Sequence, residues 1–198
     1  MITGRNTVST YLKIAFLWSL LCHPAMAGET WGLTQLMASL ARVGSVKTTF
    51  TESKTMSMLS EPLRSSGTLL YKAPDYLEKR VTSPQLSYFI VAGDDVTIGN
   101  AQNQERHVIL FQFPALEAFI AALRGTLAGD LKTLKEYYDV DFKGNADHWS
   151  LQLAPKDSEM QLYVKKILIT GNDGHIAQID TLEPNNDSST MTIQRPSE

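Results

Sequence analysis

The side chains best able to do chemistry are scattered singly along the chain. His107, His148 and His175 lie in three separate segments and form no HxH or HxxxH pair. Zinc needs three or four nitrogen, sulfur or oxygen ligands held together, so this spacing does not predict a metal centre. Asp94 and Asp95 are adjacent, which would place them on opposite faces of a strand, and a turn explains them better.

Motifs for covalent catalysis or phosphate binding are also missing from the sequence. Cys22 is the single cysteine, and no G-x-S-x-G, P-loop or dinucleotide fingerprint occurs. We therefore expect no catalytic residue, no bound metal and no cofactor. An enzyme stays an open alternative only if folding brings Asp94 or Glu78 close to His107 inside a cavity.

The first 27 residues have the pattern of a cleaved secretory signal peptide. Arg5 and Lys13 supply the positive start, and residues 14–22 form a short apolar run. Ala25-Met26-Ala27 matches the small-x-small cleavage rule. A retained membrane anchor is the alternative, but such a helix needs ~20 apolar residues.

Cleavage would leave residues 28–198 as one exported domain in the periplasm. Lipid attachment at Cys22 is the competing interpretation, but that chemistry needs a small preceding residue and Leu21 stands there. Without Arg5 and Lys13, 16 of the 18 basic residues face 21 acidic ones, a formal charge of −5. A mildly acidic chain without a basic block is a poor ligand for nucleic acid, so we expect no nucleic-acid partner.

Hydrophobic periodicity predicts the order helix, about six strands, helices, about five strands. Helical spacing covers residues 30–44, with Thr30 as N-cap and Gly44 near the end. From Val46 the period is two, and Met56 and Met58 keep the same parity. Further strands are expected at 65–72, 77–82, 86–92, 96–99, 106–113, 140–143, 149–153, 164–170, 176–182 and 189–194, and helices at 114–129 and 130–137. Most connections are too short for crossover helices, so the fold class is α+β with one antiparallel sheet.

The helix predicted over residues 115–128 is apolar or alanine around most of its circumference. We therefore expect it to be covered on more than one side. Met37, Met56 and Met58 add flexible contacts that suit variable apolar ligands. Plain core packing explains the same pattern, so a filled interior and a ligand cavity both stay open.

Several weak motifs occur in an order that resembles the LolA-like periplasmic carriers of outer-membrane lipoproteins. The resemblance covers nearly the whole mature chain. It rests on V-x-x-x-F-x-E (Val46, Phe50, Glu52), S-x-G-x-L-x-Y-x-x-P (Ser65, Gly67, Leu69, Tyr71, Pro74), Pro84, W-x-L-x-L-x-P (Trp149, Leu151, Leu153, Pro155) and I-x-x-x-G-x-D-G-x-I (Ile167, Gly171, Asp173, Gly174, Ile176).

The resemblance implies an incomplete, strongly curved antiparallel barrel whose helices cover the concave face and close an apolar cavity for acyl chains. The lid candidates that it implies are the helix over 33–43 with Leu36 and Leu40, together with Leu116, Phe119, Ile120 and Leu123. The wall candidates are Phe50, Met58, Leu69, Tyr71, Leu77 and Val81.

Two departures from the family pattern narrow this expectation. The usual carriers have an arginine before the proline that ends the second strand, where this chain has Ala73, and they have a further strand beyond the position of Glu198. The sequence is similar to a divergent LolA-related branch associated with aryl-polyene or similar lipid-linked pigments.

We predict a monomeric periplasmic carrier of a lipid, acylated protein or other amphiphile. Its partners would be an inner-membrane export complex and an outer-membrane acceptor. A non-catalytic scaffold that docks a lipidated partner is the alternative.

Overall fold

The computed structural model describes residues 31–195. The predicted signal peptide, residues 1–27, and the predicted N-cap Thr30 lie outside the described residues. Within the described part, none of the helices is both long enough and apolar enough to cross a membrane.

One antiparallel sheet of 11 strands organises the described residues. The strands are β1 (Ser45–Thr55), β2 (Leu63–Lys72), β3 (Tyr76–Ser83), β4 (Ser87–Ala92), β5 (Asp95–Asn100), β6 (Glu105–Ile109), β7 (Tyr138–Gly144), β8 (Trp149–Pro155), β9 (Lys166–Asn172), β10 (His175–Leu182) and β11 (Ser188–Ile193). Their order is β6-β5-β4-β3-β2-β1-β11-β10-β9-β8-β7. The first and last strands therefore pair in the middle, with Phe50 opposite Ile193. The edge strands β6 and β7 do not pair with each other, so the sheet stays open.

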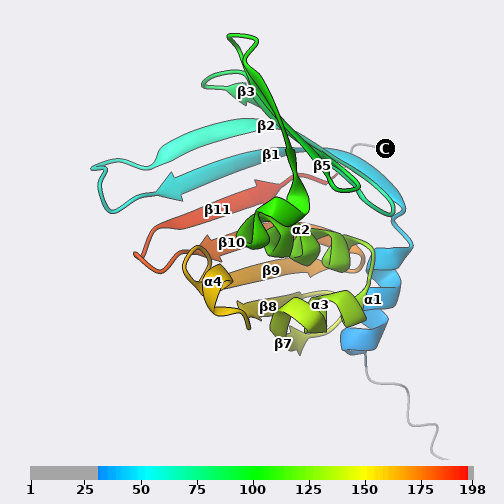
Figure 1. The fold of residues 1–198 in the computed structure, drawn as a ribbon. Coiled ribbons are helices and arrows are strands. Elements are labelled where there is room, and N and C mark those ends of the chain that lie inside the picture. Colours follow the sequence, from blue (N-terminus) through cyan, green and yellow to red (C-terminus); the bar gives the residue numbers. More distant parts are fainter. Residues whose placement is uncertain (1–30, 196–198) are drawn as a thin grey trace, which may run out of the picture. The chain divides into compact units, whose positions relative to one another are not determined.

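The helices lie on the concave side of this sheet. They are α1 (Leu33–Ala41), α2 (Pro114–Leu127), α3 (Leu131–Tyr137) and α4 (Ser158–Gln161), with a 3-10 turn at Leu110–Gln112. Helix α2 lies within the curve of the sheet, with β1 and β2 on one side and β8 and β9 on the other (Figure 1). The predicted fold class, an α+β incomplete barrel with helices over its concave face, is confirmed.

Local sequence signals explain where the helices over the sheet begin and end. Pro114 is the first residue of α2, where its missing N–H has no partner to lose. Gly129 follows α2 with a φ of +66°, a left-handed conformation that glycine adopts without steric cost. The Asp130 carboxylate accepts a hydrogen bond from the backbone N–H of Thr133 (3.0 Å) and caps α3.

Strand β2 approaches β3 unusually closely at Gly67. A Cβ at this position would lie 1.8 Å from the backbone oxygen of Arg80. The pairing of β2 with β3 also shifts register between Ser66 and Gly67, as in a β-bulge. Bulges bend a strand and increase its twist, so the small residues of β2 contribute to the curvature of the sheet.

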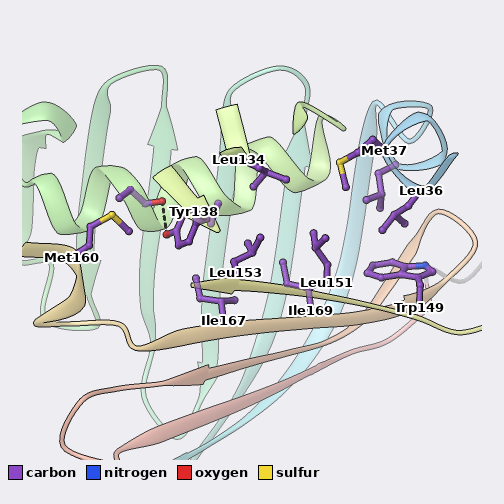
Figure 2. Close-up of a cluster of buried hydrophobic side chains, with 13 residues drawn as sticks. Leu36, Met37, Leu134, Tyr138, Trp149, Leu151, Leu153, Met160, Ile167 and Ile169 are labelled. Atoms are coloured by element: carbon purple, nitrogen blue, oxygen red, sulfur yellow. Dashed lines mark hydrogen bonds between the residues drawn. The ribbon is translucent and has the colours of Figure 1, made fainter. Parts of the chain in front are cut away.

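The largest buried cluster fills the half of the sheet formed by β7, β8 and β9 (Figure 2). Leu151, Leu153, Ile167 and Ile169 point from β8 and β9 toward the helices and are fully buried. Tyr138 lies among them, and its hydroxyl donates to the Ala118 carbonyl of α2 at 2.9 Å. Burial raises the pKa of the Tyr138 phenol, which stays a neutral hydrogen-bond donor.

Two of the expected elements differ from the structure, and one helix was not expected. The strand expected over 106–113 ends at Ile109, and the chain then turns through Leu110–Gln112 before Pro114 begins α2. The alternation expected through Met58 ends at Thr55, and Met58 lies in the following turn. Helix α4 was not expected, because four residues are too few to show a helical period.

Two glycines with the same backbone conformation provide a matched test of the contact between α1 and α2. Gly129 and Gly44 both have positive φ, +66° and +60°. A Cβ on Gly129 would lie 2.1 Å from the Met37 carbonyl oxygen, whereas a Cβ on Gly44 would meet nothing within 4 Å. We expect Gly44→Ala to lower the free energy of unfolding by ~1–2 kcal/mol from backbone strain alone. Gly129→Ala should cost a further ~1–3 kcal/mol from overpacking.

Urea unfolding of the two variants and the unmodified chain measures this difference. Equal losses for the two variants would show that α1 and α2 do not pack through Gly129.

Candidate functional site

A cavity of about 610 Å³ lies between the concave face of the sheet and helices α1 and α2. This volume falls within the ~300–1,000 Å³ of small-molecule sites. Its roof is formed by Leu40 and Val43, in and just after α1, and by Phe119, Ile120, Leu123 and Leu127 of α2. Its floor is formed by Leu69, Tyr71, Leu77, Ile169, Ile179, Met191 and Ile193 from both halves of the sheet. The arrangement can hold an apolar chain without forming a bond to it.

Seven of the twelve site residues expected from the sequence line this cavity. They are Leu40, Leu69, Tyr71, Leu77, Phe119, Ile120 and Leu123. They come from helices α1 and α2, which form the roof, and from the neighbouring strands β2 and β3. Their gathering depends on α2, which is remote in sequence from α1, β2 and β3 but lies within the curve of the sheet (Figure 1).

The other five expected residues lie elsewhere. Leu36 packs in the buried cluster over β8 and β9, and Leu116 packs against the cluster of Val91 and Val96. Val81 is half-buried near the end of β3 and does not line the cavity. Placing Met58 in the wall was wrong, because β1 ends at Thr55 and Met58 is 79% exposed.

Phe50 is also absent from the cavity lining, for a different reason. The Nζ atom of Lys79 lies 5.0 Å from the centroid of the Phe50 ring, and Phe50 is only 1% exposed. Gly67 lies between the two in the sheet, opposite Phe50, and offers no side chain to obstruct Lys79. The lysine stem therefore covers an aromatic ring that the family resemblance had implied as part of the cavity wall.

Two parts of the lining were not found from the sequence. The first is the contribution of β9, β10 and β11, through residues such as Ile179, Met191 and Ile193. Their apolar pattern is visible, but only the pairing of β1 with β11 places them beside β2. The second part consists of charged side chains. Phe50, Glu52 and Lys54 are alternate residues of one strand and so share a face, which the sequence alone could have indicated.

Four charged side chains form what we call the charged rim: Glu52, Lys54, Lys79 and Glu183. Lys79 Nζ lies 2.6 Å from Glu52 Oε2, and Lys54 Nζ lies 2.9 Å from Glu183 Oε1. Lys54 is next to the last residue of β1 and Glu183 directly follows β10. Both are partly exposed, so the cavity meets solvent at this end of the strands.

Glu52 is the most heavily hydrogen-bonded member of the rim. The hydroxyls of Ser189 and Ser65 donate to its carboxylate at 2.9 and 3.2 Å, in addition to Lys79. Burial alone would raise the pKa of Glu52, but the hydrogen bond and charge of Lys79 outweigh it, with help from the two serines. The pKa is therefore lowered, and Glu52 is ionised at neutral pH.

Arg124 connects the roof of the cavity to the sheet. Its Nη2 atom donates to the carbonyl oxygen of Gly93 at 2.6 Å and also to that of Asp75. These carbonyls belong to the β4–β5 and β2–β3 turns, so one helix side chain holds two turns. Ala73 occupies the position where the family resemblance led us to expect an arginine. In this chain Arg124, which lies on the helix and not on the sheet, connects the two.

Three polar atoms near this tie are buried without a hydrogen-bond partner among the described residues. They are Tyr71 Oη, Arg124 Nε and Thr126 Oγ1. Such atoms cost about 1–3 kcal/mol each when they are shut away from water. Two of them belong to α2 and the third lies on β2 beneath it, so moving α2 away would hydrate them.

The residues considered for an enzyme do not come together in the cavity. His107 hydrogen-bonds Glu105 at 2.8 Å and Thr97 at 3.1 Å on exposed strands and does not line the cavity. Glu78 does line the cavity, but its carboxylate contacts Tyr76 at 2.5 Å and Arg80, and it is not near His107. Across residues 31–195, no three histidine, cysteine, aspartate or glutamate side chains are grouped as metal ligands would be.

Comparison with known proteins places the chain in a family. The profile of the family described as "Outer membrane lipoprotein carrier protein LolA-like" matches residues 25–194. The chain belongs to this family. The resemblance inferred from the motif order is therefore confirmed for most of the chain, as a divergent member. No curated protein sequence matches it significantly.

Solved structures similar to this family member are distant in sequence. A LolA superfamily protein from Nitrosomonas europaea is 11% identical, with 83% of this chain and 92% of that chain covered and a TM-score of 0.45. A chain from the MucA/MucB complex of Pseudomonas aeruginosa is 10% identical, with 84% and 59% covered and a TM-score of 0.45. A chain from the complex of the CwlD amidase with the GerS lipoprotein of Clostridioides difficile is 13% identical, with 93% and 92% covered and a TM-score of 0.37.

The tie made by Arg124 can be tested by hydrogen exchange. Arg124→Gln removes the charged donor that holds the Asp75 and Gly93 carbonyls. We expect faster amide exchange in α2 and a loss of ~1–2 kcal/mol in unfolding free energy, because hydrogen bonds from charged groups are the stronger ones. Exchange in β8 should stay unchanged.

Arg106→Gln, which alters an exposed arginine of β6, is the matched control. If α2 exchanges at the same rate in both variants, Arg124 does not hold the helix down.

Proposed function

We propose that this protein is a non-catalytic carrier of the bacterial envelope that binds the apolar chain of an amphiphile beneath helix α2. The observation that supports the proposal most directly is the cavity of about 610 Å³, whose roof is apolar and whose floor is apolar except at the charged rim. Membership of the LolA-like carrier family supports it independently. The proposal includes a location in the periplasm, which the signal peptide predicted over residues 1–27 supports.

Burial of the cargo chain supplies the binding free energy in this proposal. Each buried CH₂ group contributes ~0.8 kcal/mol, so an acyl chain needs no covalent bond to be held. Leu69, Phe119 and Ile179 present apolar surface from three different elements around the space. A lipid, the acyl chain of a lipoprotein or a lipid-linked polyene all meet this requirement.

Release requires the roof to move, and α2 is suited to do so. Its tie to the turns runs through Arg124, and the buried polar atoms of Tyr71, Arg124 and Thr126 would gain water on opening. Their hydration offsets part of the cost of exposing apolar surface, which lowers the free-energy difference between closed and open states. An export complex and an acceptor at the two membranes would then act on this helix.

A docking protein is the second candidate, and one observation favours it. Met58, Leu162 and Tyr163 are 79%, 71% and 61% exposed. They lie in the β1–β2 turn and just before β9, which are at the same end of the sheet because Thr55 pairs with Ser188 and Lys166 with Leu182. Large exposed apolar side chains gathered at one end suit a protein partner.

The carrier proposal is tested first by asking what the protein holds. We expect protein purified from its own periplasm to release a lipid or polyene into organic solvent, as detected by mass spectrometry. The emptied protein should bind an apolar fluorescent dye that long-chain amphiphiles displace, because both occupy the same apolar space. The proposal fails if the extract is empty and the dye stays unbound.

A pair of substitutions separates the carrier from the docking protein. Phe119→Asp places a charge in the cavity roof and should weaken dye binding at least about tenfold, because the cavity cannot hydrate the carboxylate. Phe111→Asp makes the same change at a residue that is 65% exposed and should leave dye affinity unchanged. Circular dichroism checks that both variants fold.

The docking protein predicts another outcome. Met58→Asp and Leu162→Asp would then abolish capture of the partner, while Phe119→Asp would leave it intact.

A further inference from the structure

The charged rim differs from an ordinary surface cluster because it lies within the lining of an apolar cavity. Glu52 and Lys79 sit on the floor, on strands that also carry Phe50 and Leu77. Their side chains are only 19% and 29% exposed. Lys54 and Glu183 are partly exposed, so the lining reaches solvent at this end, and the proposal below places the polar head of the cargo there.

Both lysines of the rim already have acidic partners. Lys79 contacts Glu52 at 2.6 Å and Lys54 contacts Glu183 at 2.9 Å. The four charges sum to zero, so the rim presents alternating signs rather than a positive patch. Each ammonium group has further N–H donors to offer, and each carboxylate has further lone pairs to accept with.

A further acid, Asp187, lies next to the rim. It is buried and accepts hydrogen bonds from the Ser57 backbone N–H at 2.7 Å and from Asn185 at 2.9 Å. That backbone bond, and at longer range the charge of Lys54, lower the pKa of Asp187. Glu52 is likewise held ionised, so neither acid adapts to an incoming anion by taking up a proton at neutral pH.

An anionic head placed on this rim would meet Glu52 and Glu183 at short range without an unpaired cation to receive it. A head that carries both signs, or none, can hydrogen-bond to the lysines and carboxylates together without leaving a charge uncompensated. We propose that the charged rim selects cargo whose polar head has no net charge, zwitterionic or uncharged, over cargo with an anionic head. This inference rests on the proposed carrier function.

Three amphiphiles that share a lauroyl chain test the proposal: lysophosphatidylcholine, the monoglyceride and lysophosphatidylglycerol. Each competes with an apolar dye on the mature chain, below its micellar concentration. We expect the zwitterionic and uncharged probes to bind at least about fivefold more tightly than the anionic one at low ionic strength. The gap should shrink in ~1 M salt, where the screening length falls to ~3 Å.

Substitution of the rim acids locates the effect. Glu52→Gln and Glu183→Gln should each strengthen binding of the anionic probe several-fold by leaving a lysine unpaired, while affinity for the monoglyceride stays the same. Glu183 is the more exposed of the two, so its variant preserves the test if Glu52→Gln folds poorly. Asp141→Asn removes one acid from an exposed position on β7 and should change nothing.

The results distinguish the selection by head-group charge from the carrier function on which it rests. Dye binding with equal affinity for all three probes overturns the selection by charge but keeps the carrier. Tighter binding of the anionic probe also overturns the selection by charge. If Arg195→Gln then abolishes that preference, the polar head lies at the opposite end of the cavity, where Arg195 hydrogen-bonds Asn172. If neither dye nor any probe binds, the carrier function itself fails.

Discussion

The pairing of β1 with β11 is the contact on which the site depends. It joins the first and last strands along the register from Phe50–Ile193 to Thr55–Ser188 and unites two meanders into one sheet. Without it, the floor residues of β2 and β3 and those of β9 to β11 would belong to separate surfaces. The joined sheet is long and curves around α2 (Figure 1). The helices do not fill its concave face completely, and a cavity of about 610 Å³ remains between them and the sheet.

The concave face is covered by direct packing in one half of the sheet and by the cavity in the other. Over β7, β8 and β9 the helices pack directly, and Leu151, Leu153 and Ile167 are fully buried (Figure 2). Toward β1, β2 and β3 the roof stands away from the floor. Helix α2 spans both regions, with Ala118 and Ala122 in the packed cluster and Leu123 and Leu127 over the cavity. Small residues on one face and large apolar ones on another let one helix serve as core and as roof.

Polar groups within this apolar region have two different arrangements. The rim pairs are satisfied by each other and by Ser65 and Ser189, which makes that end of the cavity a defined polar surface. Under α2, by contrast, Tyr71 Oη and Thr126 Oγ1 lack partners among the described residues. Satisfied groups favour the arrangement in which they are seen, whereas unsatisfied ones favour a rearrangement that hydrates them. The cavity thus joins a polar end whose charged groups are paired to a roof that covers unpaired polar atoms.

Local patterns in the sequence determined the element types and their order. Alternation along β2, Pro114 at the start of α2, Asp130 at the start of α3 and the turn at Asp173 and Gly174 all depend on neighbours within a few residues. The motif order was enough to indicate the family, and with it seven residues that line the cavity.

Only the tertiary structure decided which apolar residues face empty space and which are core. Leu36 and Leu40 lie one helical turn apart and both belong to the buried cluster, yet only Leu40 also lines the cavity. The burial of Phe50 beneath Lys79, and the meeting of Glu52, Lys79, Lys54 and Glu183, depend on strands distant in sequence. A periodic pattern reports the face on which a side chain lies, but the distance to whatever lies opposite is set by the packing of the whole sheet and its helices.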